Sequence, residues 1–180
     1  PCQILSDIMT IIEQKGGYAN VRIAWVGDGN NVANSWINAA SVLGLDLILA
    51  CPDGYQINPA ILDAASEKGQ TSQIEFTNDP REAVKGADVV YTDVWASMGD
   101  EDEHVTRLKD FQGFEVNREL LALAKDDVTV LHCLPAHRGE EISEDVLEDP
   151  NGVFWDQAEN KRHMHKAILE SLILNPKTAE

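Results

Sequence analysis

The protein has 180 residues, of which 31 are Asp or Glu and 14 are Lys or Arg, so its formal net charge is -17. This charge argues against binding to nucleic acid or to an anionic membrane surface, because both depend on clustered Lys and Arg. The length is typical of a single domain. No apolar run approaches the roughly 18 residues that span a bilayer. The three cysteines (Cys2, Cys51 and Cys133) are far apart and form no C-x-x-C pattern, which favours a reducing, cytoplasmic location over disulfides or a zinc site.

Apolar periodicity, together with the positions of glycine and proline, predicts helices that alternate with strands. Helices are expected at residues 1–17, 31–43, 58–69, 79–87, 116–124, 143–149 and from 156 onward. Strands are expected at residues 21–27, 45–50, 72–77, 88–95 and 128–133. This alternation predicts one domain over residues 1–180 with a three-layer α/β/α, Rossmann-like fold. We expect its five-stranded parallel sheet to have the strand order 2-1-3-4-5.

Two other segments carry specific expectations. Residues 97–113 interrupt the alternation with a charged stretch, which predicts a long loop that is either a functional lid or disordered. Asp156 followed by Glu159 resembles a capping box and places the start of the last helix. An apolar stripe is expected along that helix at Ala158, Met164, Ile168 and Leu172.

Ligands of parallel α/β sheets bind beyond the carboxyl ends of the strands, so the residues that follow each strand are the most informative. The first strand is followed by "GDGNN", in which Gly27 and Gly29 match the start of a dinucleotide fingerprint but Val32 replaces its third glycine. A tight turn is therefore favoured over a nucleotide site. Asn30 or Asn31 would then cap the next helix, or would hold a ligand carboxylate at its N-terminus.

The fourth and fifth strands end in further polar residues. Asp93 is interpreted either as a cap or as a carboxylate that pairs with an ammonium group, and Ser97 adds a hydroxyl nearby. Cys133 has three interpretations: a nucleophile, a proton partner or an apolar filler. A neighbouring cation would lower the pKa of this thiol. The bond between Leu134 and the following proline is a candidate cis peptide, and His132 is a candidate structural residue.

Six motifs appear in a fixed order along the chain: "PCQILSD", "GDGNNVANS", "DVWASMGDE", "FQGFEVN", "HCLPAHRGEE" and "QAEN". Together they resemble the second, ornithine-binding domain of the aspartate/ornithine carbamoyltransferase family, over essentially the whole chain. "SMG" and "HCLP" are similar to the ornithine enzymes of this family rather than to the aspartate enzymes.

The resemblance implies transfer of a carbamoyl group from carbamoyl phosphate to the δ-amine of L-ornithine, which gives citrulline and phosphate and belongs to arginine biosynthesis. It implies no metal and no organic cofactor. It also implies a homo-oligomer, a trimer in the family, and an N-terminal carbamoyl-phosphate-binding domain outside these 180 residues. The chain begins at Pro1, so we expect it to be a processed chain or a piece of a larger protein, without turnover of its own.

The resemblance also assigns roles to residues. Asp93 and Cys133 are expected to act in catalysis. The expected ornithine contacts are Asn31 for the α-carboxylate, Asp93 for the α-ammonium, Ser97 and Met98 along the site, and Cys133 with the Leu134 carbonyl beside the δ-amine. The expected carbamoyl phosphate contacts are Gln3, Cys133, Leu134 and Lys161. Lys161 stands where the family has an Arg, and a lysine cannot form the same two-pronged contact.

Three alternatives stay open. The chain is an ornithine-binding module without turnover, or it self-associates through apolar faces of its first and last helices, which include Ile4, Ile8 and Leu172. The third alternative is a carbamoyltransferase for another amine, such as putrescine or an acylated ornithine.

Overall fold

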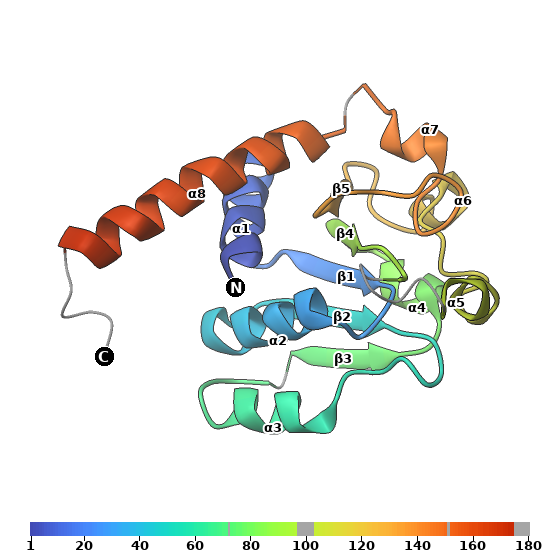
Figure 1. The fold of residues 1–180 in the computed structure, drawn as a ribbon, viewed down its shortest axis with the longest axis horizontal. Coiled ribbons are helices and arrows are strands. Elements are labelled where there is room, and N and C mark those ends of the chain that lie inside the picture. The colour runs from blue at the N-terminus through green and yellow to red at the C-terminus, as the bar shows by residue number, and fades with distance from the viewer. Residues whose placement is uncertain (72, 97–102, 151, 175–180) are drawn as a thin grey trace.

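The structure is a computed structural model that describes residues 1–71, 73–96, 103–150 and 152–174. It contains a five-stranded, all-parallel sheet with helices on both faces, which confirms the predicted three-layer architecture (Figure 1). The strands are β1 (Arg22–Val26), β2 (Asp46–Ala50), β3 (Ile74–Thr77), β4 (Val89–Thr92) and β5 (Thr129–His132). The helices are α1 (Cys2–Lys15), α2 (Asn31–Leu43), α3 (Pro59–Ser66), α4 (Pro80–Val84), α5 (His104–Asp110), α6 (Arg118–Leu121), α7 (Glu144–Leu147) and α8 (Phe154–Leu174).

Strand residues alternate between two hydrophobic cores, one on each face of the sheet. Ile23 and Trp25 of β1 belong to the core that α1 and α2 cover. Ala24 and Val26 belong to the core on the side of α4 and α6. Because successive side chains of a strand point to opposite faces, a strand buried on both sides reads as a continuous apolar run.

The strand order is 3-2-1-4-5, so the predicted order 2-1-3-4-5 is wrong in the placement of β3. This strand pairs with the outer side of β2 and forms one edge of the sheet. Its side chains fit an edge, since Glu75 and Phe76 are exposed. β1 therefore pairs directly with β4, and the chain reverses its winding direction between them.

Local signals define several helix ends as predicted. α2 spans the same residues as the predicted helix, with a left-handed Gly44 at its C-terminus. The Asn58 side chain accepts a hydrogen bond from the Ala60 N–H at the start of α3, and Asp79 does the same for α4. Such side-chain acceptors satisfy amide groups that have no partner inside the helix.

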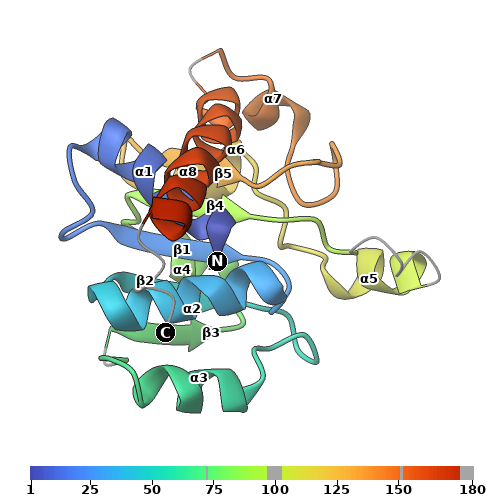
Figure 2. The same ribbon diagram turned by 60° about the vertical axis from the view of Figure 1, so that its left-hand side comes forward.

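Helix α5 replaces part of the predicted loop at residues 97–113, of which residues 97–102 lie outside the described part of the chain. The helix lies at the edge beyond the strand arrowheads and extends away from the body (Figures 1 and 2). No α5 residue is fully buried, but Phe111, which directly follows the helix, is buried. Phe111 stacks on Trp95 with ring centroids 5.3 Å apart. Tertiary packing of one aromatic residue thus stabilises a short helix that its charged sequence does not reveal.

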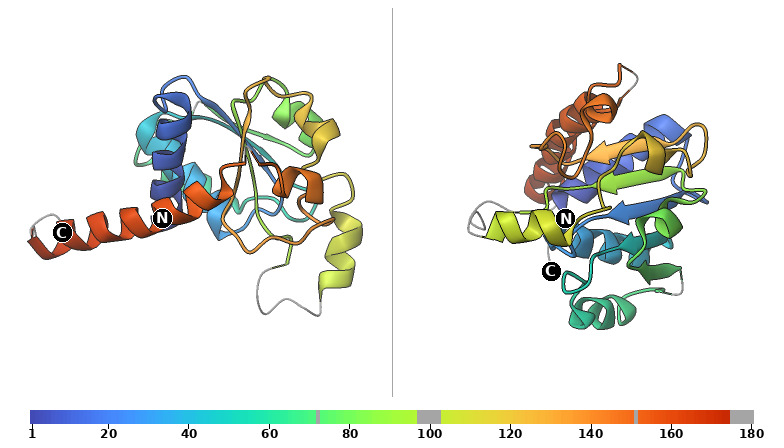
Figure 3. Two further views of the ribbon diagram at one scale, coloured as in Figure 1. Left: turned by 90° about the horizontal axis from the view of Figure 1, so that it is seen from above. Right: turned by 90° about the vertical axis from the view of Figure 1, so that its right-hand side faces the viewer.

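Helix α8 begins at Phe154, so the predicted start at Asp156 is two residues late. The predicted apolar stripe does not form the buried face of α8, because Ala158 and Leu172 are exposed. The buried residues of α8 are Phe154 and the polar Gln157 and Asn160. Beyond them the helix projects away from the rest of the molecule (Figure 3).

Helix α1 packs against α8 and the sheet, and its apolar face is covered. Ile4 and Ile8 are therefore buried, which corrects the expectation that they are exposed together with Leu172. Leu5 and Ile12 are the large apolar side chains of α1 that remain exposed. None of the described helices is long and apolar enough to cross a membrane.

Candidate functional site

Three polar side chains from three different strand ends meet at the carboxyl edge of the sheet. The Asn30 amide donates a hydrogen bond to Asp93 Oδ2 over 2.8 Å. The Cys133 thiol donates to Asp93 Oδ1 over 2.9 Å, and the Val94 backbone N–H donates to the same oxygen. Asp93 is buried, while Asn30 and Cys133 are half-buried. The carboxylate thus lies at the centre of the cluster and accepts hydrogen bonds on both oxygens.

The strand order explains why these residues meet. β4 lies between β1 and β5, so the residues that follow these three strands are neighbours. Thr92 adds a cross-strand hydrogen bond from its hydroxyl to the Val26 carbonyl over 2.8 Å. In a parallel sheet, the crevice where the winding direction reverses is the usual place for ligands. The cluster lies at this point.

The two glycines of "GDGNN" have a structural role in the backbone of this loop. Gly27 has a φ of 145°, a conformation that other residues rarely adopt. A Cβ on Gly29 would lie 2.7 Å from the Tyr55 carbonyl oxygen and 2.8 Å from the Ile57 nitrogen. The Gly29 N–H donates to that Tyr55 carbonyl over 2.9 Å. The two glycines therefore allow a turn and a close approach of two loops, which accounts for the G-x-G pattern without a nucleotide.

Asn30, rather than Asn31, is the helix cap of α2. Its Oδ1 accepts hydrogen bonds from the Val32 and Ala33 N–H groups while its amide reaches Asp93. Asn31 is the exposed first residue of the helix. Of the other expected ornithine contacts, Ser97 and Met98 lie outside the described residues.

The environment of Cys133 disfavours a thiolate. Burial raises the pKa of this thiol well above its usual range, and the neighbouring Asp93 carboxylate raises it further. The structure places a carboxylate rather than a cation beside this thiol, so the condition for a lowered pKa is not met. The thiol is a protonated hydrogen-bond donor in this site, not an activated nucleophile.

A buried histidine–glutamate pair holds the turn after β5. The Leu134 N–H donates to His132 Nδ1 over 2.9 Å, and His132 Nε2 lies 3.1 Å from Glu141 Oε1. The His137 N–H also donates to this glutamate oxygen. Leu134 has a φ of 55° and the Leu134–Pro135 peptide is cis, as the sequence suggested. His132 is thus structural, and the pair fixes the backbone beside Cys133.

Two of the four residues expected to contact carbamoyl phosphate, Gln3 and Lys161, act on a second buried carboxylate, Asp7. Gln3 and Gln157 each donate to Asp7 Oδ1 over 2.8 Å, and the Tyr91 hydroxyl donates to Asp7 Oδ2 over 2.9 Å. The positive charge of Lys161 lowers the pKa of the same carboxyl group. Burial raises the pKa of Asp7 to about 6, although these hydrogen bonds oppose the shift. Gln3 and Lys161 come from α1 and α8, two helices that pack against each other.

The raised pKa of Asp7 predicts a pH-dependent stability. The Asp7 carboxyl binds its proton more tightly in the folded protein than in the unfolded chain, and this difference stabilises the fold. The stabilisation is complete below the usual Asp pKa of 3.8 and is lost as pH rises through the folded-state pKa of about 6. The loss amounts to roughly 3 kcal/mol. Urea unfolding should therefore show that wild type loses more stability than Asp7→Asn between about pH 4 and pH 7. Asp63→Asn, on an exposed part of α3, is the control. A constant difference between wild type and Asp7→Asn across this range would contradict the raised pKa.

Two groups among the described residues bring three potential metal ligands within 4.8 Å of one another: Asp93 with His132 and Cys133, and His137 with Glu140 and Glu141. In the first group, both ring nitrogens of His132 already have hydrogen-bond partners. A metal there would have to replace the contacts that shape the turn. The first group is therefore better described as a hydrogen-bonded cluster.

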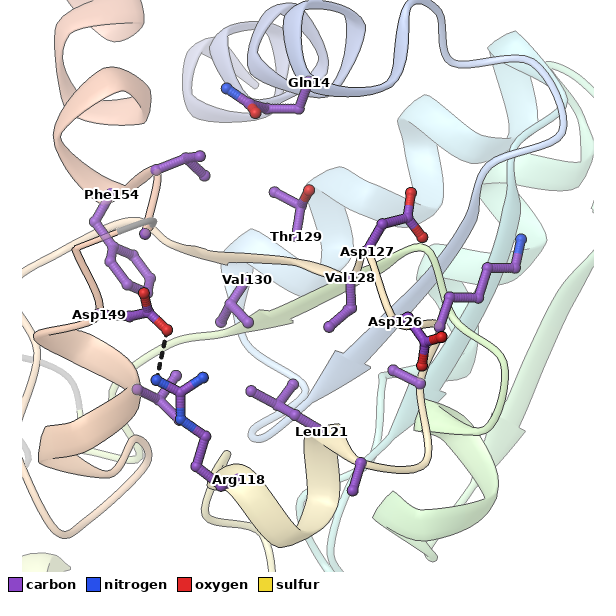
Figure 4. Close-up of a pocket in the computed structure, with 16 residues that line it drawn as sticks. Gln14, Arg118, Leu121, Asp126, Asp127, Val128, Thr129, Val130, Asp149 and Phe154 are labelled. Atoms are coloured by element: carbon purple, nitrogen blue, oxygen red, sulfur yellow. Dashed lines mark hydrogen bonds and ion pairs between the residues drawn. The ribbon is translucent and has the colours of Figure 1, made fainter.

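A cavity of about 540 Å³ lies elsewhere, along the edge strand β5 (Figure 4). Val128, Thr129 and Val130 line it, and an ion pair between Arg118 and Asp149 closes one side. It includes none of the residues of the Asp93 cluster. This cavity and the Asp93 cluster therefore lie in different parts of the fold.

Sequence reasoning missed several residues of the site. The sequence indicates Asn30 only as a helix cap or a ligand contact, and it does not single out Asp7, Tyr91 or Glu141. A signal existed for Tyr91, because it lies two residues before Asp93 and so shares its face of the strand region. The contact between Asp7 and Gln157 spans 150 residues, and no local pattern points to it.

Comparison with known proteins gives a consistent result. Residues 19–172 match the family described as "Aspartate/ornithine carbamoyltransferase, Asp/Orn binding domain". The chain is 61% identical over 173 residues to the ornithine carbamoyltransferase of Desulfotalea psychrophila, and this match covers 96% of the chain and 57% of that protein. The corresponding protein of Archaeoglobus fulgidus is 52% identical and is covered to 56% of its length.

Solved structures agree. The ornithine carbamoyltransferase from Pyrococcus furiosus superposes with a TM-score of 0.86 at 49% identity, over 94% of this chain and 55% of that chain. The enzyme from Thermus thermophilus gives a TM-score of 0.82 at 45% identity, over 96% of this chain and 55% of that one. The chain thus spans little more than half the length of the relatives it matches. It belongs to the aspartate/ornithine carbamoyltransferase family and corresponds to its aspartate/ornithine-binding domain.

Proposed function

We propose that residues 1–180 form the ornithine-binding domain of an ornithine carbamoyltransferase. The observation that carries this proposal is the convergence of Asn30, Asp93 and Cys133 at the strand edge, in a chain of this family. A buried carboxylate attracts an ammonium group, and the helix N-terminus that begins at Asn31 attracts a carboxylate. An α-amino acid carries both charges on one carbon.

The protonated Cys133 suits transfer to an amine. The δ-amine of ornithine attacks the carbonyl carbon of carbamoyl phosphate, a C–N bond forms, the C–O bond to the phosphate breaks, and the proton that the amine loses leaves with the phosphate. The attacking amine must be neutral, so an anion beside it would work against the reaction by favouring its charged form. A neutral thiol and the Leu134 carbonyl avoid this, and both can orient the amine by hydrogen bonds.

The carbamoyl phosphate side of the proposal rests on Gln3 and Lys161, together with Cys133 and Leu134. Gln3 and Lys161 come from opposite ends of the chain, where Gln3 donates a hydrogen bond to Asp7 and the charge of Lys161 lowers the pKa of that carboxyl. Lysine offers a single point charge to a phosphate where an arginine would offer two parallel donors. We therefore infer that most of the phosphate-binding groups belong to the remainder of the enzyme, and that the chain alone forms no citrulline.

A partner domain and a homo-oligomer are part of the same proposal. Apolar side chains stay exposed on the projecting end of α8, including Leu172, Ile173 and Leu174. Leu5 of α1 and Val42 of α2 line an apolar groove between those helices. Exposed apolar groups in such number are typical of surfaces that other protein covers. The alternative of a self-associating chain rests on the same observation, and sedimentation at several protein concentrations separates the two.

Titration with L-ornithine, followed by heteronuclear NMR, tests the proposal. Saturable shifts are expected for the backbone amides of Asn31, Asp93 and Cys133 and for the side-chain amide of Asn30. Binding should be weak, because the contacts that other parts of the enzyme would supply are missing. No shifts at millimolar ornithine, in an otherwise dispersed spectrum, would contradict an ornithine site in this chain.

Two related amines separate ornithine from the alternative acceptors. Putrescine lacks the α-carboxylate, and an ornithine acylated on its α-nitrogen lacks the α-ammonium group. If Asp93 and the α2 N-terminus recognise those charges, both compounds should bind more weakly than ornithine. Tighter binding of either compound would favour a carbamoyltransferase for that amine.

A further inference from the structure

Arg107 of α5 connects segments that surround the candidate site. Its Nη1 donates to Asp28 Oδ2 over 2.8 Å and to the Trp95 carbonyl oxygen over 2.7 Å. Its Nε lies 3.3 Å from a carboxylate oxygen of Glu103. Asp28 belongs to the loop after β1, and Trp95 belongs to the segment after β4. One guanidinium group therefore bridges the two chain segments that supply Asn30 and Asp93.

The loop after β2 joins the same assembly. The guanidinium carbon of Arg107 lies 5.0 Å from the centre of the Tyr55 ring, a cation–π distance. The Tyr55 hydroxyl donates to Asp110 at the end of α5 over 2.8 Å. The Tyr55 carbonyl accepts the Gly29 N–H, so this loop also contacts "GDGNN". Arg107 thus contacts the loops that follow β1, β2 and β4 at the carboxyl edge of the sheet.

The pair between Arg107 and Asp28 differs from the other arginine pairs. Its side chains are only 13% and 16% exposed, whereas those of Arg81 and Glu119 are 56% and 82% exposed. Burial raises the pKa of Asp28, and the hydrogen bond from Arg107 opposes that shift. Removal of one partner of such a pair leaves a poorly solvated charge, and the surrounding loops must then move or rehydrate.

Arg107 contacts residues that lie close in sequence to the proposed ornithine-binding residues. Asp28 lies two residues before Asn30, and Trp95 lies two residues after Asp93. Resting on the proposed function, we propose that Arg107 is a positioning residue for the ornithine site: by bridging Asp28 and Trp95, it holds Asn30 and Asp93 at the separation that their hydrogen bond and the ligand require. Within the described part of the chain, its hydrogen-bond partners are Asp28, Trp95 and Glu103, and they include neither Asp93 nor Cys133.

Ornithine titrations of four variants test this role: Arg107→Gln, Arg107→Lys, Asp28→Asn and the double variant Asp28→Asn/Arg107→Gln. We expect Arg107→Gln and Asp28→Asn each to weaken binding about tenfold. The double variant should be no weaker than either single one, because all three remove the same bridge. Arg107→Lys should be intermediate, since one ammonium group can reach Asp28 but cannot replace the guanidinium contacts with Glu103 and the Tyr55 ring. Arg81→Gln, which breaks an exposed pair, is the control and should bind like wild type.

A stability measurement separates positioning from a merely structural role. If Arg107→Gln lowers the urea midpoint but binds ornithine with wild-type affinity when folded, the proposal is wrong. The proposal is also wrong if the double variant loses as much ornithine affinity as the two single variants lose together. If the wild-type chain shows no saturable ornithine binding, the proposed function is wrong. NMR spectra without ligand then test whether Arg107 positions Asn30 and Asp93. The Asn30 side-chain amide and the Val94 backbone amide should then shift alike in Arg107→Gln and Asp28→Asn. Unchanged resonances at these positions would refute the bridge.

Discussion

Asp93→Asn is expected to weaken ornithine binding by the chain roughly a hundredfold, because loss of one partner from a buried charge pair costs about 3 kcal/mol. The carboxylate is the buried acceptor of the Asn30 amide, the Cys133 thiol and the Val94 N–H, so its charge is held in one place. The substitution keeps the size of the side chain and removes the charge that the α-ammonium group would meet. Isothermal titration calorimetry measures the effect.

Two controls make the result specific. Asp63→Asn changes the same chemical group on the exposed surface of α3 and should leave binding unchanged. A urea titration of Asp93→Asn shows whether the variant is folded at the temperature of the binding experiment. A folded Asp93→Asn variant that binds ornithine as tightly as wild type would exclude Asp93 as the ammonium-binding group.

Gly29→Ala is expected to destabilise the fold by about 3 kcal/mol, at the upper end of the effects of overpacking. Its new methyl group would lie within 2.8 Å of the backbone of residues 55–57, and a backbone cannot give way as a flexible side chain does. The strained loop carries Asp28 and Asn30, so ornithine binding should fall as well. Urea unfolding and the ornithine titration measure the two effects.

Gly17→Ala is the matched control. A Cβ on Gly17 would meet nothing within 4 Å, and the residue has no positive φ. Its effect on the free energy of unfolding should stay within about 0.5 kcal/mol. Equal stability of the two alanine variants would show that the loops after β1 and β2 are not closely packed at Gly29.

The pattern of elements could be predicted because its signals are local. α2 begins and ends where the sequence analysis placed it, since an Asn at its start and Gly44 at its end act within one turn of the helix. All five strands exist, because each is a short apolar run bounded by turn residues. The same reasoning indicated that the residues after strands β1, β4 and β5 were the ones to inspect.

Errors arose where long-range contacts decide the structure. Gln157 and Asn160 form the buried face of α8 because Asp7 and Thr10 on α1, 150 residues away, accept their hydrogen bonds. A polar residue is tolerated in a core only where such partners exist, and the local apolar stripe gives no information about them. Helix α5 was missed for a similar reason, since the aromatic contact that stabilises it comes from Trp95.

The sequence by itself determined the alternation of helices and strands, the family and the polar residues at the strand ends, because periodicity, caps and motifs are written in neighbouring residues. Only the tertiary structure decided the strand order, and with it the meeting of Asn30, Asp93 and Cys133. With β3 between β1 and β4, as predicted, Asn30 and Asp93 would be about one strand spacing, roughly 4.8 Å, further apart. The partner of a parallel strand is selected by the packing of whole faces across long crossovers, so no short segment of sequence specifies it.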